Sequence, residues 1–239
     1  MLQEVECIFS ETGIDNPDCK SCFCRSDEFN FMTDSELEQV TRNKFQVNYK
    51  AGELIFKQGI HSTHCISFTH GTAKVYVEDR HGEIILRLIK PTAFIIGYGM
   101  LFDNVHDYSV AAITNSSVCF VDFQLIEEIF NNNKHFRKAF FTKMQQHNYF
   151  IQLRMINLLN KKNPGRVAGT LLYLARDFYN ADSFLLHLSR KELSALCVVS
   201  FESLSRILSQ FHEAGLIAVN GKKIDILKPN MLEKIWLNG

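Results

Sequence analysis

The 239-residue chain lacks several features that would assign it to a common functional class. It has no net charge, with 26 basic and 26 acidic side chains, so bulk electrostatics alone does not bind it to nucleic acid or membrane. No apolar run approaches the roughly 18 residues of a membrane span, and the first residues do not combine a basic region with a hydrophobic stretch. We therefore expect a cytoplasmic protein with no membrane partner.

Signatures of catalysis are also missing. The nine histidines show no zinc-protease spacing, and the chain has neither a Gly-x-Ser-x-Gly elbow nor a glycine-rich phosphate-binding loop. We therefore expect that it is not an enzyme. Its 46% hydrophobic content is ample for a packed core, and its length allows two domains.

The charges are unevenly divided along the chain. Residues 161–239 hold 11 basic and 7 acidic side chains, a net charge of +4, which leaves 15 basic and 19 acidic side chains, a net charge of −4, before them. A basic C-terminal part is consistent with a nucleic-acid partner, and the patterns found there are more specific than the charge.

Residues 189–228 have the pattern of a helix-turn-helix followed by a two-stranded wing. Ser189 precedes Glu192 by three residues, the spacing of a capping box that begins a helix. Leu193 and Leu196 point this helix inward, and the segment 197–199 is short enough for a tight turn. We expect Ser200 to cap the second helix.

The second helix is the candidate reader of DNA. Its predicted buried stripe recurs at three- and four-residue spacing, at Leu204, Ile207, Leu208 and Phe211. Glu202, Ser205 and Arg206 lie together on the opposite face, near the helix N-terminus that enters the major groove in this motif. Arginine can pair with guanine, glutamate can accept from cytosine, and serine adapts to several base edges.

The predicted wing adds basic side chains. Residues 216–219 and 224–227 are short apolar runs joined around Asn220-Gly221, a dipeptide favoured in type I′ hairpin turns. Lys222 and Lys223 follow, placed to meet phosphate. The candidate DNA contacts are Ser189, Arg190, Ser200, Phe201, Glu202, Ser203, Ser205, Arg206, Lys222 and Lys223.

The first half predicts a different structure. Short β-rich runs alternate with turn signals and indicate eight strands in a sandwich or roll, at residues 45–49, 54–56, 65–69, 73–78, 83–89, 94–98, 109–114 and 117–121. A helix is expected at 123–131 and a much longer one at 135–160. The fold class is α+β: an antiparallel, jelly-roll-like β-roll, a long dimerisation helix and a winged helix-turn-helix.

The long helix predicts dimerisation, because it carries two apolar stripes and therefore needs two neighbours. The first stripe is Phe136, Phe140, Met144, Ile151, Met155 and Leu158, and the second is Phe150, Leu153, Ile156 and Leu159. We expect one neighbour to be the roll and the other to be the same helix of a second subunit. The alternative is a helix wholly buried within one subunit. Asn163-Pro164-Gly165 is expected to end this helix and form a linker to a helix at 166–180.

This order of elements resembles the Crp/Fnr superfamily of bacterial transcription regulators, from Phe29 to Trp236. The segments that carry the resemblance are 51–59, 71–76, 188–193 and 200–208. The resemblance implies an N-terminal extension at 1–30, a cyclic-nucleotide-binding-like sensor at 31–132, a dimerisation helix at 133–162 and a DNA-binding domain at 163–239. It also implies RNA polymerase as a possible partner.

The reading motif is similar to that of the Fnr-like branch. Glu202, Ser205 and Arg206 reproduce its Glu-x-x-Ser-Arg pattern, which implies a half-site like TTGA. Cys197 stands where the family has a hinge glycine, which leaves the angle between the two helices open. Phe201, at a position that is often polar, could touch a thymine methyl group.

The predicted effector pocket is degenerate. The cyclic-nucleotide branch holds ribose with Gly-Glu and the cyclic phosphate with Arg-Ser, whereas here Gly97 precedes Tyr98 and Gly99, and Tyr108 precedes Ser109. A buried phosphate without a cation would lose several kcal/mol to desolvation. We therefore expect that cyclic AMP does not bind in the familiar way, and the effector stays open.

The seven cysteines leave alternatives. In Fnr-branch oxygen sensors an N-terminal cluster and one central cysteine hold an iron–sulfur cluster, and the corresponding thiols here are Cys19, Cys22, Cys24 and Cys119. The spacing of Cys22 and Cys24 is tighter than in those sensors. Zinc, a redox disulfide or ordinary reduced thiols are the other interpretations. A further alternative for the whole chain is a ligand-binding signalling protein whose C-terminal domain docks on protein.

Overall fold

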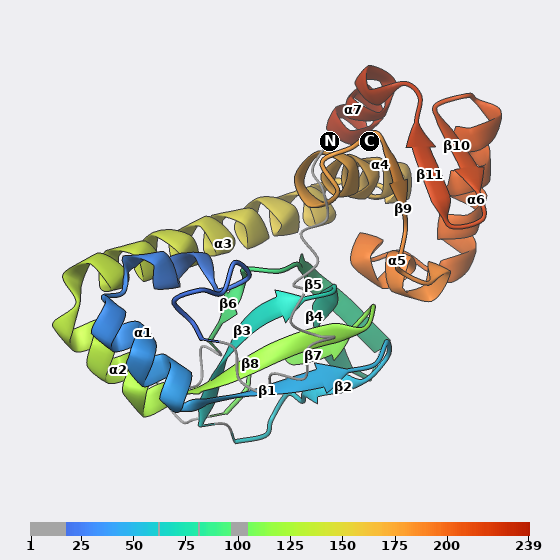
Figure 1. Ribbon diagram of the computed structural model, residues 1–239. Coiled ribbons are helices and arrows are strands. Elements are labelled where there is room, and N and C mark those ends of the chain that lie inside the picture. The colour runs from blue at the N-terminus through green and yellow to red at the C-terminus, as the bar shows by residue number, and fades with distance from the viewer. Residues whose placement is uncertain (1–17, 62, 81, 97–104) are drawn as a thin grey trace. The chain divides into compact units, whose positions relative to one another are not determined.

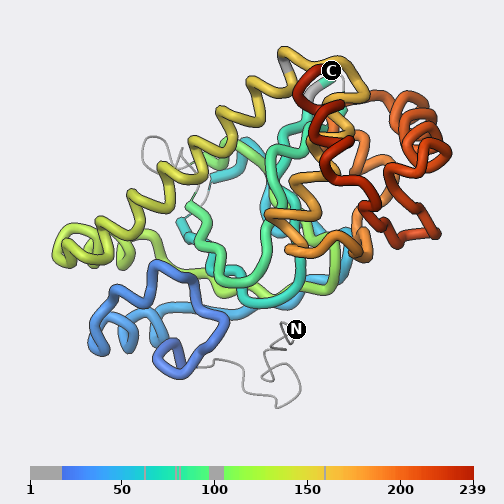
Figure 2. The backbone as a smooth tube through the Cα atoms, turned by 90° about the horizontal axis from the view of Figure 1, so that it is seen from above, coloured from blue at the N-terminus to red at the C-terminus, as the bar shows by residue number. Residues whose placement is uncertain are grey.

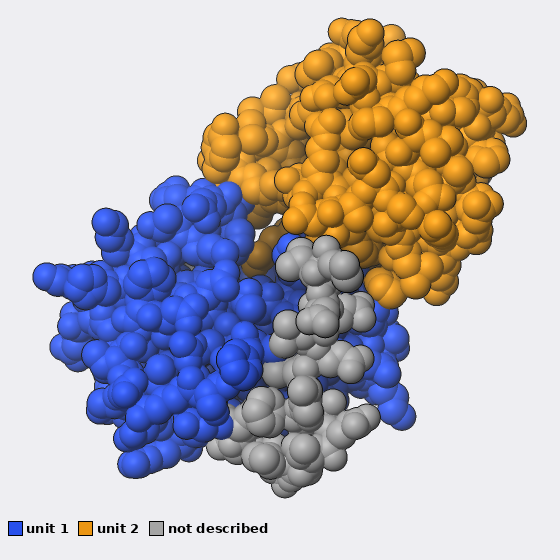
Figure 3. Space-filling view, turned by 45° about the horizontal axis from the view of Figure 1, so that its top comes forward, with its two compact units in different colours: residues 1–77, 88–148 blue, residues 78–87, 149–239 orange. Residues whose placement is uncertain are grey.

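The computed structural model describes residues 18–61, 63–80, 82–96 and 105–239. It forms two compact units (Figure 3). Unit 1 comprises residues 1–77 and 88–148, and unit 2 comprises residues 78–87 and 149–239. Each unit is described by itself below.

Two antiparallel sheets form the β-roll, and all eight predicted strands are confirmed (Figure 1). One sheet has the order β1-β8-β3-β6 and the other β2-β7-β4-β5. The strands are β1 (Lys44–Tyr49), β2 (Leu54–Phe56), β3 (His64–His70), β4 (Ala73–Asp79), β5 (Gly82–Ile89), β6 (Phe94–Ile95), β7 (Ser109–Ala112) and β8 (Ser116–Asp122). Strand β6 is shorter than predicted, and residues 97 and 98 lie outside the described residues.

Gly71 shows why the turns between these strands need glycine. Its φ of 85° lies in the left-handed region, and a Cβ there would come within 2.3 Å of the backbone oxygen of Asn115. The turn from β3 to β4 therefore tolerates no larger residue without a shift of the backbone.

Short helices complete the core of unit 1. The 3₁₀-helix η2 (Asp27–Phe31) and helix α1 (Asp34–Arg42) precede β1, and α2 (Phe123–Asn132) follows β8. Helix α1, which was not predicted, begins at a capping box between Thr33 and Glu36. Phe29 is fully buried, and its ring packs edge to face on that of Phe94, with ring centroids 5.0 Å apart. Phe136 belongs to the same buried hydrophobic cluster.

Helix α3 (Lys134–Asn160) is the long predicted helix, and Figure 2 shows it as one continuous coil. Asn133 caps it, because its side-chain oxygen accepts bonds from the backbone N–H groups of His135 and Phe136, both at 2.9 Å. In the first predicted stripe, Phe136 is buried and Met155 is exposed. Among the described side chains of α3, the exposed large apolar ones are Phe141, Tyr149, Leu153, Met155 and Ile156.

Unit 2 contains the second half of α3, five further helical segments and a small sheet. Its helical segments after α3 are α4 (Asn163–Tyr173), the π-helical segment η4 (Leu174–Phe178), α5 (Arg190–Cys197), α6 (Phe201–Glu213) and α7 (Pro229–Asn238). The predicted linker at 163–165 is wrong: Asn163 begins α4, with Pro164 in its first turn. Proline fits there because the first N–H groups of a helix need no helical partner. Only Lys161 and Lys162 separate α3 from α4.

The sheet of unit 2 corrects the prediction for the wing. It has three strands in the order β10-β11-β9, with β9 (Ser183–Leu185), β10 (Ile217–Asn220) and β11 (Lys223–Ile226). Asn220 pairs with Lys223, so Gly221 and Lys222 are the turn residues. Of these two, only Gly221 has a positive φ, of 62°. This is the pattern of a type II′ turn rather than type I′.

Among the described residues, no helix combines the length and the apolar character needed to cross a membrane.

Candidate nucleic-acid interface

Helix α5 begins as the sequence predicts. The Ser189 side chain accepts a bond from the backbone N–H of Glu192 at 3.2 Å, and the Glu192 carboxylate accepts one from the backbone N–H of Ser189 at 2.8 Å. Leu193 and Leu196 are fully buried. The capping box thus defines where the helix starts, and the two leucines anchor it on the rest of unit 2.

The turn after α5 departs from the prediction at one residue. Cys197 is the last residue of α5, whereas Val198 has the left-handed backbone, with φ 52° and ψ 52°. The position that favours glycine is therefore Val198 and not Cys197. A β-branched residue in this conformation is strained by about 1–2 kcal/mol, because its Cβ approaches the next carbonyl oxygen.

Two arginines hold the carbonyl groups around this turn. Arg154 of α3 donates to the carbonyl oxygen of Leu196, and Arg166 of α4 donates to that of Val198 at 3.0 Å. Arg154 also donates to the carbonyl oxygen of Leu86 at 2.9 Å. The sequence predicted a role for neither arginine, because their targets are backbone atoms more than 30 residues away.

Helix α6 presents the predicted polar face. The Ser200 side chain caps it by accepting a bond from the backbone N–H of Ser203 at 3.2 Å. Its buried stripe is the predicted one, at Leu204, Ile207, Leu208 and Phe211. Glu202, Ser205 and Arg206 are all exposed. The structure therefore leaves a carboxylate, a hydroxyl and a guanidinium group open to solvent on adjacent turns of one helix.

The remaining candidates on α6 differ in role. Ser200 and Ser203 form the helix cap and hydrogen-bond each other at 3.1 Å. Phe201 is 49% exposed beside Glu202. An exposed aromatic ring at a helix start does not contribute to the core, so its apolar surface is available to a partner.

The wing and α5 are joined by Arg190, whose guanidinium donates to the backbone oxygen of Gly221 at 3.4 Å. Lys222 is exposed at the turn. Lys223 is also exposed, but its ammonium group lies 3.4 Å from a carboxylate oxygen of Asp225. The Asp225 pKa is lowered mainly by a hydrogen bond from Ser183, and the ion pair with Lys223 lowers it further. Lys222 therefore has the less compensated charge.

The predicted effector residues are only partly described. Gly97, Tyr98 and Gly99 lie outside the described residues. Tyr108 is buried and donates to the carbonyl oxygen of Ile96 at 3.1 Å. Ser109 is also buried, and its hydroxyl accepts from the backbone N–H of Gln58 at 3.0 Å. Both side chains therefore bond to the backbone of the roll itself.

In the described part of the chain, the four cysteines considered as cluster ligands are not gathered as metal ligands would be. Cys19, Cys22 and Cys24 are buried near α1, and Cys119 is buried in β8, opposite Gln46 and Ser67. Burial raises the pKa of the Cys19 thiol, which opposes the thiolate form that a metal needs. Within the part of the chain that the structure describes, no three His, Cys, Asp or Glu side chains gather as metal ligands would.

The other two cysteines in regular structure behave as predicted. Cys65 and Cys197 are fully buried, and burial raises the pKa of the Cys197 thiol to about 11. Both act as small apolar side chains of the core.

One buried polar residue of the roll was not predicted from the sequence. His106 is 5% exposed and stacks on Phe56, with ring centroids 3.9 Å apart. Burial lowers its pKa, so the neutral imidazole is favoured. Its Nδ1 atom has no hydrogen-bond partner among the described residues.

Two domain families match the chain. The cyclic nucleotide-binding domain family matches residues 46–133, and the Crp-like helix-turn-helix domain family matches residues 165–235. The first match covers the roll and α2, and the second covers α4 to α7.

Relatives and solved structures agree with these matches. The transcriptional activator protein Anr of Pseudomonas protegens is 25% identical over 222 residues, which is 90% of each chain. The fumarate and nitrate reduction regulatory protein of Escherichia coli is 24% identical over 205 residues, 84% of this chain and 81% of that protein. These relatives are transcription regulators by name.

Solved structures show the same fold. FixK2 from Bradyrhizobium japonicum superimposes with a TM-score of 0.72 at 21% identity, covering 80% of this chain and 96% of FixK2. A putative regulator of the crp/fnr family from Eubacterium rectale gives a TM-score of 0.71 at 16% identity, covering 88% and 98%. With its helix-turn-helix DNA-binding domain, the chain belongs to the Crp/Fnr superfamily of transcription regulators.

Proposed function

We propose that this regulator binds, as a homodimer, a palindrome of TTGA-like half-sites, with Glu202, Ser205 and Arg206 reading the base edges. The observation that carries the proposal is the exposure of these three side chains on one face of α6. The buried stripe on the opposite face fixes that orientation. Arginine pairs with guanine O6 and N7, and glutamate accepts from the cytosine amino group.

The exposed apolar face of α3 supports the proposal of a homodimer. Phe141, Tyr149 and Ile156 are exposed apolar side chains, and at about 100° per residue they lie within one face of the helix. Pairing with the same face of a second copy would remove them from water. A two-fold dimer presents two copies of α6 to successive major grooves about 34 Å apart.

We propose further that the roll does not bind cyclic AMP in the family's familiar way. Tyr108 and Ser109, at the positions expected to contact the cyclic phosphate, hydrogen-bond the backbone instead. A regulator of this kind acts beside the chromosome, so the proposal places it in the cytoplasm with RNA polymerase as a further partner. It assigns the chain no catalytic reaction.

A mobility-shift titration on TTGA-N₆-TCAA and on random DNA of equal length tests the assignment. The parent protein should prefer the palindrome. Arg206→Ala should weaken binding to the palindrome by about 1–3 kcal/mol, roughly 10- to 100-fold, and relax the preference at the guanine. Equal losses on the palindrome and on random DNA would refute base reading by Arg206.

Lys222→Ala is the matched control, because it also removes one exposed cation from unit 2. A phosphate contact carries no sequence information, so this variant should weaken both DNAs alike. It should also reduce the slope of log affinity against log salt by about 1. A parent protein that shifts neither DNA would instead favour a C-terminal domain that docks on protein.

A further inference from the structure

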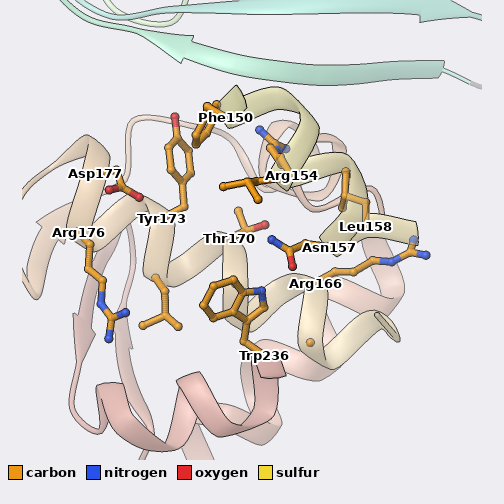
Figure 4. Close-up of a pocket in the computed structure, with 14 residues that line it drawn as sticks. Phe150, Arg154, Asn157, Leu158, Arg166, Thr170, Tyr173, Arg176, Asp177 and Trp236 are labelled. Carbon is orange, nitrogen blue, oxygen red and sulfur yellow. The ribbon is translucent and has the colours of Figure 1, made fainter. Parts of the chain in front are cut away.

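A cavity of about 220 Å³ lies within unit 2, between the second half of α3, helix α4 and helix α7 (Figure 4). An engineered cavity of about 150 Å³ is large enough to bind benzene. The cavity here therefore has room for one aromatic ring with a short side chain.

Aromatic side chains form much of its wall. The rings of Phe150 and Tyr173 lie 5.2 Å apart, and Trp236 of α7 faces them across the cavity (Figure 4). Gly169 makes room for the indole, because a Cβ there would lie 2.7 Å from its Cδ1 atom. Such walls favour a flat apolar ligand.

Arg154 is the polar group of the cavity that favours an anion. The hydrogen bonds that the structure gives its guanidinium group run to the backbone carbonyl oxygens of Leu86 and Leu196. Carbonyl oxygens accept hydrogen bonds from the guanidinium N–H groups but carry no negative charge that would neutralise the cation. Desolvation lowers the pKa of Arg154, which shows that water stabilises its cation poorly. Asp177 also lines the cavity, and Arg176 pairs with Glu233 at 3.1 Å.

We propose that this cavity binds a small aromatic carboxylate, with the ring between Phe150, Tyr173 and Trp236 and the carboxylate on Arg154. A carboxylate is a stronger acceptor for guanidinium than a carbonyl, so the ligand competes with the carbonyl oxygen of Leu196 for Arg154. Leu196 is next to the last residue of α5. The ligand therefore reaches the turn that orients α6.

A second observation supports a binding role. The wall that carries Tyr173, Arg176 and Asp177 is the junction of α4 with the π-helical segment η4. Single π-helical turns inside α-helices are rare and often occur at functional sites. Here the irregular segment places Arg176 and Asp177 at the cavity rather than continuing the regular α4 pattern.

The face of α3 that lines the cavity differs from the face proposed for dimerisation. At about 100° per residue, Phe150, Arg154 and Asn157 point to one side of the helix, and Tyr149 and Ile156 point about 80° or more away from each of them. Leu153 lies at the edge between the two faces. Dimerisation through the exposed apolar face therefore leaves the cavity open to a ligand.

The single tryptophan of the chain makes the site directly testable, because Trp236 lines the cavity. Phenylacetate should change its fluorescence saturably, and the neutral phenylacetamide should bind at least tenfold more weakly. Arg154→Met should reduce phenylacetate binding to the level of phenylacetamide. Asn157→Phe, which fills the cavity and leaves the arginines in place, should abolish the response to both compounds.

Circular dichroism of each variant checks that it folds. If Arg154→Met does not fold, the response of Asn157→Phe still tests the site. Equal binding of phenylacetate and phenylacetamide would overturn the anion site. Quenching that stays linear to millimolar concentration would overturn it too. The site would also be overturned if the fluorescence response to phenylacetate disappeared at protein concentrations that favour the dimer, because a second copy would then cover the cavity.

The coupling to DNA rests on the proposed function and has its own readout. Saturating phenylacetate should weaken binding to the palindrome several-fold in the parent protein and leave Asn157→Phe unaffected. An unchanged DNA affinity with saturable quenching would overturn the coupling to the turn. A parent protein that does not bind the palindrome even without phenylacetate would sink the proposed function and leave the fluorescence result standing.

Discussion

Unit 1 and unit 2 use their polar side chains in opposite ways. In α6 of unit 2, Glu202, Ser205 and Arg206 are exposed, and the fold uses only the apolar face of the helix. In the roll of unit 1, Tyr108 and Ser109 occupy the expected effector positions but are buried and bonded to the backbone. The proposed DNA-reading surface is open to a partner, whereas Tyr108 and Ser109, the described residues of the expected effector pocket, bond to the backbone of the roll.

The difference has an energetic consequence. An exposed polar group exchanges water for a base edge when DNA binds, and the net gain of such an exchange is about 0.5–1.5 kcal/mol for a typical hydrogen bond. A ligand that recruited Tyr108 or Ser109 would first break a part-buried hydrogen bond within the fold and leave its backbone partner without that bond. On the proposed function, the scaffold keeps its DNA-reading surface while two residues expected in the effector pocket bond within the roll.

The largest expected effect on DNA affinity comes from preventing dimerisation, which separates the two copies of α6. Ile156→Glu places a charge in the exposed apolar face of α3, where Ile156 is 54% exposed. Dimer formation should fail because burying that carboxylate is costly. The affinity for the palindrome should then fall about 100-fold, since two linked DNA-binding domains gain at least that factor from avidity. Sedimentation and mobility-shift assays measure the two losses.

Gln146→Glu is the matched control for Ile156→Glu. It adds the same charge to an exposed, already polar position of α3. This variant should remain dimeric and bind the palindrome like the parent protein. A dimeric Ile156→Glu protein would show that the copies associate through another surface.

A second test concerns the turn that connects α5 to α6. Val198→Gly removes the strain of a left-handed valine, whereas Val199→Gly makes the same chemical change at a residue without a positive φ. Both variants gain the same backbone freedom when unfolded. Their free energies of unfolding should therefore differ by about 1–2 kcal/mol in favour of Val198→Gly. Urea denaturation of both proteins measures this difference, and equal values would mean that the turn stores no strain.

The sequence predicted most of the regular structure because its signals are local. The capping box of α5 and the buried stripe of α6 each depend on residues within one or two turns, and both are confirmed. Helix α1 begins with the same kind of local signal, a capping box of Thr33 and Glu36, although this helix was not predicted from the sequence. Strand β9 has only three residues and no distinctive pattern, so its place beside β11 depends on tertiary contacts.

The wrong prediction at the turn and the failure to predict the cavity have a different cause. The left-handed position depends on where α5 ends, and a valine there gives no glycine signal. Arg154 and Arg166 act on backbone carbonyl groups that any sequence supplies. The cavity depends on Phe150, Tyr173 and Trp236, which are far apart in the chain. Its existence follows from packing, which no local pattern records.

The burial of His106 is a further non-local feature, and it provides the smallest expected effect. Its place beside Phe56 lowers the imidazole pKa below the usual value near 6.5. The unfolded chain therefore binds a proton more readily than the folded chain. The free energy of unfolding should rise with pH up to about 6.5, and this contribution should be lost as the pH falls toward the folded-state pKa.

His106→Gln removes the titrating group and keeps a polar side chain of similar reach. Urea denaturation at several pH values should show a shallower rise in stability below about pH 6.5 than in the parent protein. His70→Gln, at an exposed position of β3, controls for the loss of a histidine elsewhere in the roll. An unchanged pH slope in His106→Gln would mean that the imidazole binds a proton equally well in the folded and the unfolded chain. Burial beside Phe56 would then not disfavour the imidazolium, and the contrast between an internally satisfied unit 1 and an open unit 2 would fail at this residue.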